Sequence, residues 1–261
     1  MPSLSLEITG HVATVRLNRP EKRNAIHLPM FEELADCGRE LCAAPGVRAV
    51  VLAGSGEAFC AGLDTALFAT VDSAMLGALL EPRQGSPANL FQAAAWTWRD
   101  LAVPVVCALH GVVYGAGLQV ALGADIRIAA PATRFSIREV AWGLVPDMGL
   151  CVLARGLVPP DALRELAYTG RVFDAAEALR HRFVTRLEDE PLAAAEAVAA
   201  AIAARSPDAV RAMKRLFAEG LLLPAAEALR LEADLQAGLI GTPNQREAAL
   251  ANAERREPDF D

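Results

Sequence analysis

The chain has 261 residues with a formal net charge of −7, and 53% of its residues are hydrophobic. This length suffices for one large domain, or for a domain with an appendage, without stabilisation by disulfides or metals. The absence of any lysine and arginine block argues against nucleic acid as a partner, and five cysteines without a C-x-x-C pair argue against a zinc site and are typical of the reducing cytoplasm.

Strand and helix patterns alternate up to residue 190. Residues 5–18 predict a hairpin that turns at Thr9-Gly10, without the charged-then-apolar layout of a signal peptide. Residues 27–43 carry a helical pattern, and three short apolar runs predict buried strands: residues 47–54, 103–111 and 125–131. These units predict an α/β fold built around a sheet. Residues 65–90, rich in glycine and proline, predict a loop or a lid.

The longest apolar region, residues 101–124, is long enough on length alone to cross a membrane. However, Pro104, His110 and Gln119 interrupt it, and the charged Asp125 follows directly. We therefore predict a buried strand followed by a buried helix, and no membrane as a partner.

The end of the chain has a different composition, being rich in alanine and helical in pattern. Ser206-Pro207-Asp208 predicts a helix start, with a capping residue, a proline in the first turn and an acid near the positive end of the helix dipole. Asp174, three residues before Glu177, predicts a second cap of this kind. A boundary between the two parts is expected near residues 195–205.

Two segments end an apolar strand in a loop of small residues that leads into a helix, at residues 50–64 and 105–125. Small residues let another molecule approach the backbone, and the first N–H groups of the helix point at it. Two such junctions side by side would aim two N–H groups at one oxygen, which is an oxyanion hole.

Other interpretations of these loops were weighed. The run "GAGLQV" is part of a dinucleotide-binding fingerprint, but Val120 stands where the third glycine is required. The run "GSGEAF" lacks the serine of a nucleophile elbow. A third possibility is that both loops are merely tight turns.

Five motifs occur in the order and spacing of crotonases: "LNRPEKRNAI" (17–26), "GSGEAFCAGLD" (54–64), "HGVVYGAGLQVALGADIRIAA" (110–130), "FSIREVAWGLVPDMG" (135–149) and "LAYTGRVFDAAEAL" (166–179). On these motifs the chain resembles the enoyl-CoA hydratase/isomerase (crotonase) family from residue 5 to 260. The resemblance implies a spiral of β-β-α units over residues 1–200 and a helical region over 201–261. In the family that helical region builds trimers, which usually pair into hexamers.

The resemblance also implies site residues. The oxyanion hole would use the backbone N–H groups of Leu63 and Ala116, which stabilise the enolate of a thioester. Coenzyme A would enter as part of the substrate, with no metal and no other cofactor. Its predicted contacts are Ala61, Lys22 and Arg23, with Lys214 reaching the nucleotide bound to a neighbouring subunit.

The acid/base residues differ from those of a hydratase. Hydratases in the family have two glutamates, at positions that are Gln119 and Glu139 here, and glutamine can hold a water but cannot take its proton. Glu139 and Asp147 resemble in their spacing the acidic pair of dienoyl-CoA isomerases. Each also has a capping interpretation: Ser136 and Glu139 have capping-box spacing, and Asp147 precedes a helical pattern.

Three functions follow from these residues. The first is an acyl-CoA enzyme that shifts a double bond through an enolate, with Glu139, Asp147 and Gln119 at the site. The second is a hydratase that uses Glu139 and a water positioned by Gln119, and the third is an acyl-CoA-binding protein without turnover. An apolar tunnel for the acyl chain, as an alternative to helix packing, would be lined by these residues: Leu67, Phe68, Leu79, Leu80, Phe91, Trp96 and Trp98.

Overall fold

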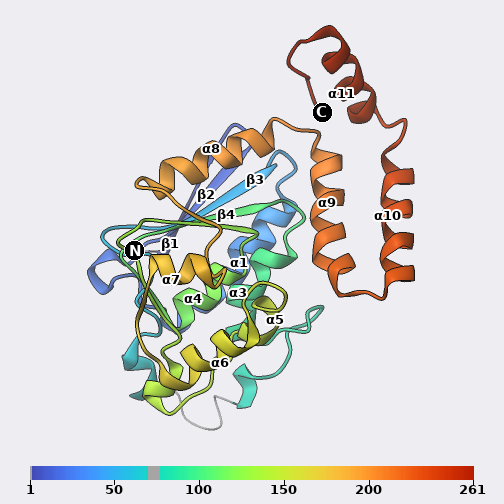
Figure 1. Ribbon diagram of the computed structural model, residues 1–261. Coiled ribbons are helices and arrows are strands. Elements are labelled where there is room, and N and C mark those ends of the chain that lie inside the picture. Colours follow the sequence, from blue (N-terminus) through green and yellow to red (C-terminus); the bar gives the residue numbers. More distant parts are fainter. Residues whose placement is uncertain (1, 70–76) are drawn as a thin grey trace.

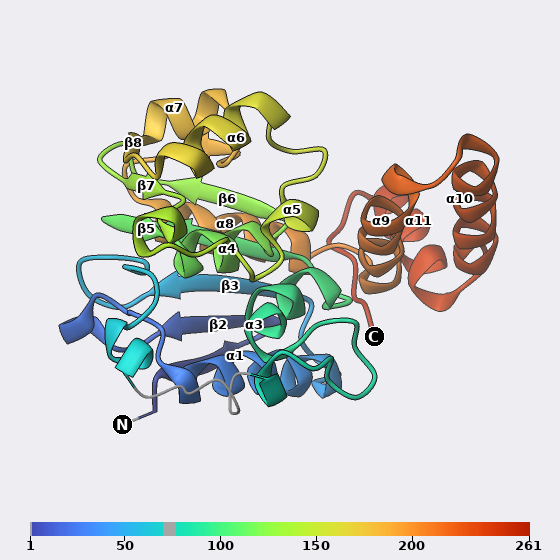
Figure 2. The same ribbon diagram turned by 90° about the horizontal axis from the view of Figure 1, so that it is seen from below.

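The computed structural model describes residues 2–69 and 77–261, and the strands among them form two sheets (Figures 1 and 2). The larger sheet has the order β1-β2-β3-β4-β6-β9: β1 (Leu4–Thr9), β2 (Val12–Leu17), β3 (Ala49–Gly54), β4 (Val105–Leu109), β6 (Ile126–Ala129) and β9 (Arg186–Leu187). The smaller sheet has the order β5-β7-β8: β5 (Val112–Tyr114), β7 (Arg134–Ser136) and β8 (Phe173–Asp174).

Helices cover both faces of the larger sheet and continue beyond it. They are α1 (Leu28–Ala43), α3 (Leu90–Asp100), α4 (Ala116–Leu122), α5 (Leu150–Leu153), α6 (Pro160–Thr169), α7 (Ala175–Arg180), α8 (Pro191–Ala203), α9 (Pro207–Glu219), α10 (Ala225–Leu239) and α11 (Pro243–Glu254). Short 3₁₀ turns are η1 (Pro20–Lys22), η2 (Thr65–Ala69), η3 (Glu139–Trp142) and η4 (Gly220–Leu222).

The path of the chain confirms the predicted α/β spiral. Strands β1 and β2 form the predicted antiparallel hairpin, and β2, β3, β4, β6 and β9 are parallel neighbours. From β4 the chain crosses to β5 in the smaller sheet and then enters α4. It returns to the larger sheet as β6 and crosses again to β7. These two turns therefore each carry a strand from each sheet, and because β5 and β7 are parallel neighbours, the loops after them lie together.

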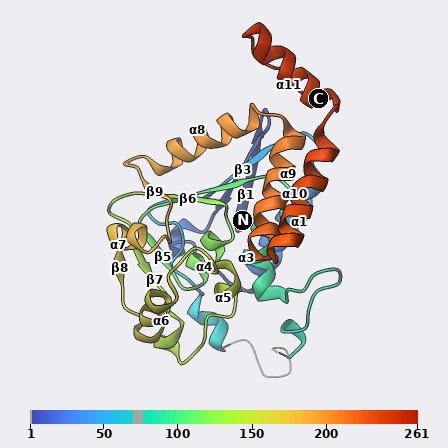
Figure 3. The same cartoon turned by 45° about the vertical axis from the view of Figure 1, so that its right-hand side comes forward.

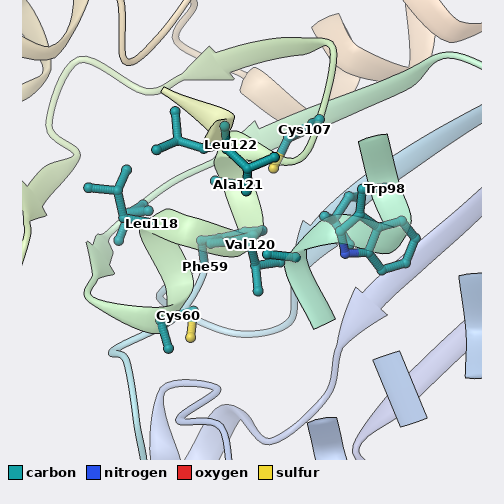
Figure 4. Close-up of a cluster of buried hydrophobic side chains, with 14 of the residues drawn as sticks. Phe59, Cys60, Trp98, Cys107, Leu118, Val120, Ala121 and Leu122 are labelled. Atoms are coloured by element: carbon teal, nitrogen blue, oxygen red, sulfur yellow. The ribbon is translucent and has the colours of Figure 1, made fainter. Parts of the chain in front are cut away.

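The two faces of the larger sheet are packed differently. On one face, α8 lays Ala195, Ala199 and Ala203 against the sheet, because residues four apart share one side of a helix. On the other face, α1, α3 and α4 bury the main core. Every residue of α4 is buried, among them Leu118 and Val120 in the cluster of Figure 4. The apolar region 101–124 is thus a buried strand and a buried helix, as predicted.

Helices α9 and α10 lie side by side at one edge of the body, and α11 extends beyond them (Figures 1 and 3). Ser206 caps α9 by accepting from the Ala209 N–H, and Asp174 caps α7 by accepting from the Glu177 N–H, as predicted. Helix α8 packs on the sheet as far as Ala203. No helix among the described residues is long and apolar enough to cross a membrane.

The capping interpretations of the acidic pair are wrong. The Ser136 hydroxyl donates to the Gly170 carbonyl oxygen at 2.9 Å, and η3 begins after Arg138 without a side-chain cap. Helix α5 begins after Gly149, also without a side-chain cap. Glu139 and Asp147 therefore do not serve as caps. Of the predicted lid at 65–90, η2 and the start of α3 are described, whereas residues 70–76 lie outside the described part.

Candidate active site

A cavity of about 640 Å³ opens between the loop 61–67, the start of α4 and the segment that follows β7. Seven of the nine predicted site residues line it: Lys22, Ala61, Leu63, Ala116, Gln119, Glu139 and Asp147. Arg23 and Lys214 do not. The parallel order of β3, β4 and β6 explains this gathering, because the loops that leave these strands emerge at one edge of the sheet.

Two strand-like contacts bring the loop at residues 60–64 alongside its neighbours. Cys60 bridges to Val113 of β5, and Leu63 bridges to Ile26. In the second bridge, Ile26 donates its N–H to Gly62 and accepts from the N–H of Asp64, each at 2.8 Å. This pattern leaves the N–H of Leu63 outside the ladder.

The second candidate donor is the N–H of Ala116, the first residue of α4. The first N–H groups of a helix have no partner within the helix. Neither the Ala116 N–H nor the Leu63 N–H meets an acceptor among residues 2–69 and 77–261. Close approach of the two segments requires small residues, since a Cβ on Gly117 would lie 2.5 Å from the Cβ of Cys60. The sequence therefore brings two free donors to one wall of the cavity.

An ion pair between Arg19 and Asp64 stabilises the loop at residues 60–64. Arg19 Nη2 lies 3.1 Å from Asp64 Oδ2, and Arg19 Nη1 donates to the Ala25 carbonyl oxygen. Although burial by itself would raise it, the pKa of Asp64 is held below its ordinary value by the Ala66 N–H and by Arg19. We interpret Arg19 as a support for the loop at residues 60–64.

The predicted acid/base residues lie close to these backbone N–H donors. Gln119 Nε2 donates to Glu139 Oε1 at 2.7 Å, and Gln119 Oε1 accepts from the Met148 N–H at 2.9 Å. Glu139 Oε2 is buried and has no hydrogen-bond partner among the described residues. Glu139 Oε1 lies 3.3 Å from where a Cβ on Gly115 would stand, which is next to the Ala116 donor.

Both carboxyl groups bind their protons more tightly than usual. Burial raises the pKa of Glu139, and the nearby charge of Asp147 adds to this, whereas the backbone N–H of Glu139, the amide of Gln119 and the backbone N–H of Arg138 oppose it. Asp147 is exposed as a residue, but partial burial of its carboxyl group in the cavity raises the pKa of that group as well. Carboxyl groups with raised pKa values in a cleft suit proton transfer near neutral pH.

The predicted coenzyme A contacts separate into two groups. Lys22 is exposed at the cavity mouth, and its ammonium has no ion-pair partner among the described residues. Ala61 also lines the cavity, with its N–H donated to the Arg23 carbonyl oxygen. The Arg23 side chain instead pairs with Glu57 at 2.8 Å on the surface. The structure thus keeps Lys22 and Ala61 at the cavity and directs Arg23 away from it.

The assignment of Lys214 to coenzyme A is corrected by the structure. Its ammonium is buried and donates to the carbonyl oxygens of Trp98 and Val103 and to Asp125 Oδ2, at 3.0, 2.8 and 2.9 Å. These bonds use the three N–H donors of a lysine, so none remains for a phosphate. Lys214 fastens α9 to the body of the molecule.

Sequence reasoning missed several residues of the cavity wall. One of them is Phe31, which meets Phe91 edge to face with ring centroids 4.9 Å apart. Tyr114 and Arg138 also line the cavity, and their positions directly before Gly115 and Glu139 were the available signals. Of the residues predicted to line an apolar tunnel, three line the cavity, namely Leu67, Leu80 and Phe91, whereas Leu79, Trp96 and Trp98 do not. The side chain of Phe68 lies outside the described part.

No group of three or more His, Cys, Asp or Glu side chains among the described residues is arranged to hold a metal ion.

Comparisons with known proteins show the family and the fold of the chain. A family model described as enoyl-CoA hydratase/isomerase matches residues 7–261. The chain is 35% identical to a probable enoyl-CoA hydratase, EchA14, of Mycobacterium tuberculosis over 80% of this chain and 78% of that protein. It is 31% identical to the mitochondrial Delta(3,5)-Delta(2,4)-dienoyl-CoA isomerase of Homo sapiens, over 97% and 80%. The crystal structure of a putative enoyl-CoA hydratase from Streptomyces coelicolor A3(2) superposes with a TM-score of 0.90 at 34% identity, covering 100% and 94%.

Proposed function

The chain belongs to the enoyl-CoA hydratase/isomerase family, and from this premise we propose that it isomerises the double bonds of an enoyl- or dienoyl-CoA. The substrate thioester would enter at the mouth with Lys22, and its acyl chain would lie along the wall with Phe31 and Phe91. Coenzyme A is then part of the substrate, and the reaction needs no further cofactor.

The proposed reaction makes two proton transfers, one from the acyl chain to Glu139 and one from Asp147 to the acyl chain. Exchange with solvent then returns Glu139 to its carboxylate and Asp147 to its acid form for the next turnover. The thioester oxygen accepts hydrogen bonds from the N–H groups of Leu63 and Ala116. Glu139 takes a proton from the acyl chain near the thioester, and the C–H electrons form the enolate that these donors stabilise. Asp147, entering in its acid form, returns a proton further along the chain as the electrons move back. Each donor would contribute about 3–4 kcal/mol to enolate stabilisation.

The observation that carries this proposal is the pair of carboxyl groups with the Gln119 amide beside them. Syn addition of water needs two groups that hold and activate that water. The amide of Gln119 is already bonded to Glu139 and to the Met148 N–H, and it cannot accept a proton. Asp147 supplies the second acid/base group. Isomerisation uses this group to return a proton to a carbon further along the acyl chain.

The first test is the ultraviolet spectrum of the protein mixed with a 3,5-dienoyl-CoA. We expect the conjugated 2,4-dienoyl thioester band to grow with wild type and to be absent with Glu139→Gln and with Asp147→Asn. Asp161→Asn, a surface change of the same chemistry, serves as the control and should retain activity. No change in the spectrum at high enzyme concentration would refute the dienoyl-CoA isomerase.

The second candidate, a hydratase, is supported by relatives of the chain that are named enoyl-CoA hydratases. It requires Glu139 as the base, with water held by the remaining N–H of Gln119. Product mass separates the two reactions, because hydration adds one water to a 2-enoyl-CoA and isomerisation leaves the mass unchanged. Binding of the thioester without either product would indicate the third candidate, an acyl-CoA-binding protein.

We also propose a homotrimer or a dimer of trimers. The support is the apolar surface of α9 and η4, where Phe217 is 59% exposed and Leu221 is 79% exposed. These residues line a groove of about 730 Å³ between α9 and the body. Light scattering after gel filtration tests the assembly, and a monomer at micromolar concentration would overturn it.

Five free cysteines support a cytoplasmic location.

A further inference from the structure

Gln119 lies at a point from which it contacts both acidic segments. It is 2% exposed on α4, a helix whose residues are all buried. Its amide donates to Glu139 on one side and accepts from the Met148 N–H on the other. Since Met148 directly follows Asp147, one side chain contacts Glu139 itself and the backbone next to Asp147.

The chemistry of the two bonds requires an amide. The bond to Glu139 needs a donor, and the bond to Met148 needs an acceptor, so neither a carboxylate nor an apolar side chain can make both. The two bonds also set which way the amide faces. A shorter asparagine would not span the same distance from α4.

The two oxygens of Glu139 differ in their hydrogen bonding. Oε1 is held by Gln119, whereas Oε2 is buried without a partner among the described residues. A buried carboxylate oxygen that accepts no hydrogen bond carries negative charge less favourably than one that accepts a bond. It is therefore the more basic of the two oxygens.

We propose that Gln119 is a positioning residue, which holds Glu139 through Oε1 so that Oε2 serves as the base, and which fixes the backbone beside Asp147 at a set distance from it. This inference rests on the proposed isomerisation. Gln119 itself transfers no proton. Its role is to hold two groups from different segments in register with one acyl chain.

The test compares Gln119→Met with Leu118→Met. Methionine keeps the volume of glutamine and removes both hydrogen bonds, while Leu118→Met makes a volume-conserving change at the adjacent buried position. For Gln119→Met we expect kcat on the 3,5-dienoyl-CoA to fall about ten- to a hundredfold with KM within about twofold. The acid limb of the pH profile should move to higher pH, because the Gln119 N–H stabilises the charged form of Glu139. Leu118→Met should leave both unchanged.

Gln119→Glu separates the two bonds. It keeps an acceptor for the Met148 N–H, removes the donor to Glu139 and adds a negative charge, so its acid limb should move further than that of Gln119→Met. A variant that loses thermal stability but retains the wild-type acid limb and kcat would overturn the positioning role.

A titration without turnover distinguishes failure of the inference from failure of the proposed function. The Glu139 carboxyl band is assigned by infrared difference against Glu139→Gln and followed with pH. If wild type fails to isomerise the dienoyl-CoA and yet the band titrates at higher pH in Gln119→Met, the proposed function is wrong and Gln119 still positions Glu139. If the band titrates alike in both proteins, the inference is wrong whatever the activity.

Discussion

Lys214→Met tests whether this lysine fastens the C-terminal helices to the body. The change leaves the carbonyl oxygens of Trp98 and Val103 without their donor, while the methionine retains most of the apolar stem. Each carbonyl left buried and unpaired costs about 1–2 kcal/mol. Asp125 is 37% exposed and keeps its bond from the Val105 N–H, so water can replace its lost partner at a cost below about 1 kcal/mol. The expected loss is about 2–4 kcal/mol.

The assay is thermal unfolding of the full chain at a fixed protein concentration, combined with KM for the acyl-CoA substrate. In a chain of this size each kcal/mol corresponds to about 2–4 °C, so Tm should fall by about 5–15 °C. KM should stay unchanged. Lys22→Met makes the same chemical change at an exposed position on the cavity mouth. It should raise KM and leave Tm within about 2 °C.

The opposite pattern would refute the argument. If Lys214→Met raised KM and left Tm unchanged, the ammonium would be free to bind coenzyme A, as the sequence suggested. The carbonyl oxygens of Trp98 and Val103 would then be satisfied in another way.

Three further predictions concern the site and the backbone. Burial raises the pKa of Glu139 above 4.5, so the native state holds this proton more tightly than the unfolded chain does. Ionisation of Glu139 therefore costs stability as the pH rises from 4.5. Glu139→Gln should raise Tm at pH 8, and this gain should shrink at pH 4. Ala116→Pro removes an N–H at a first helical position that tolerates proline, and it should lower kcat at least about a hundredfold with the circular dichroism spectrum retained; a loss below tenfold would remove Ala116 from the oxyanion hole. Arg182 has a left-handed φ of 63°, so Arg182→Gly should stabilise the protein by about 1 kcal/mol. The urea midpoint of unfolding should rise, and an unchanged midpoint would contradict the assumed backbone strain.

Local sequence determined the features that depend on near neighbours. The hairpin at Thr9-Gly10, the buried strand and helix of 101–124, and the caps Ser206 and Asp174 were all predicted from short stretches. Their physical causes act within a turn or along one strand, through hydrophobic periodicity and the unpaired N–H groups of a helix start. The pair of glycine-bearing loops was predicted in the same way, since each ends a strand and begins a helix or turn.

Only the tertiary structure decided how polar side chains from distant segments pair. Spacing suggested that Ser136 caps a helix with Glu139, but its hydroxyl bonds to Gly170, 34 residues away. Lys214 finds carbonyl partners 111 and 116 residues away. The amide of Gln119 joins segments 20 and 29 residues further along the chain. A buried polar group must be paired wherever the fold brings a partner, and the stacking of the spiral turns, which no local pattern encodes, decides which partner that is.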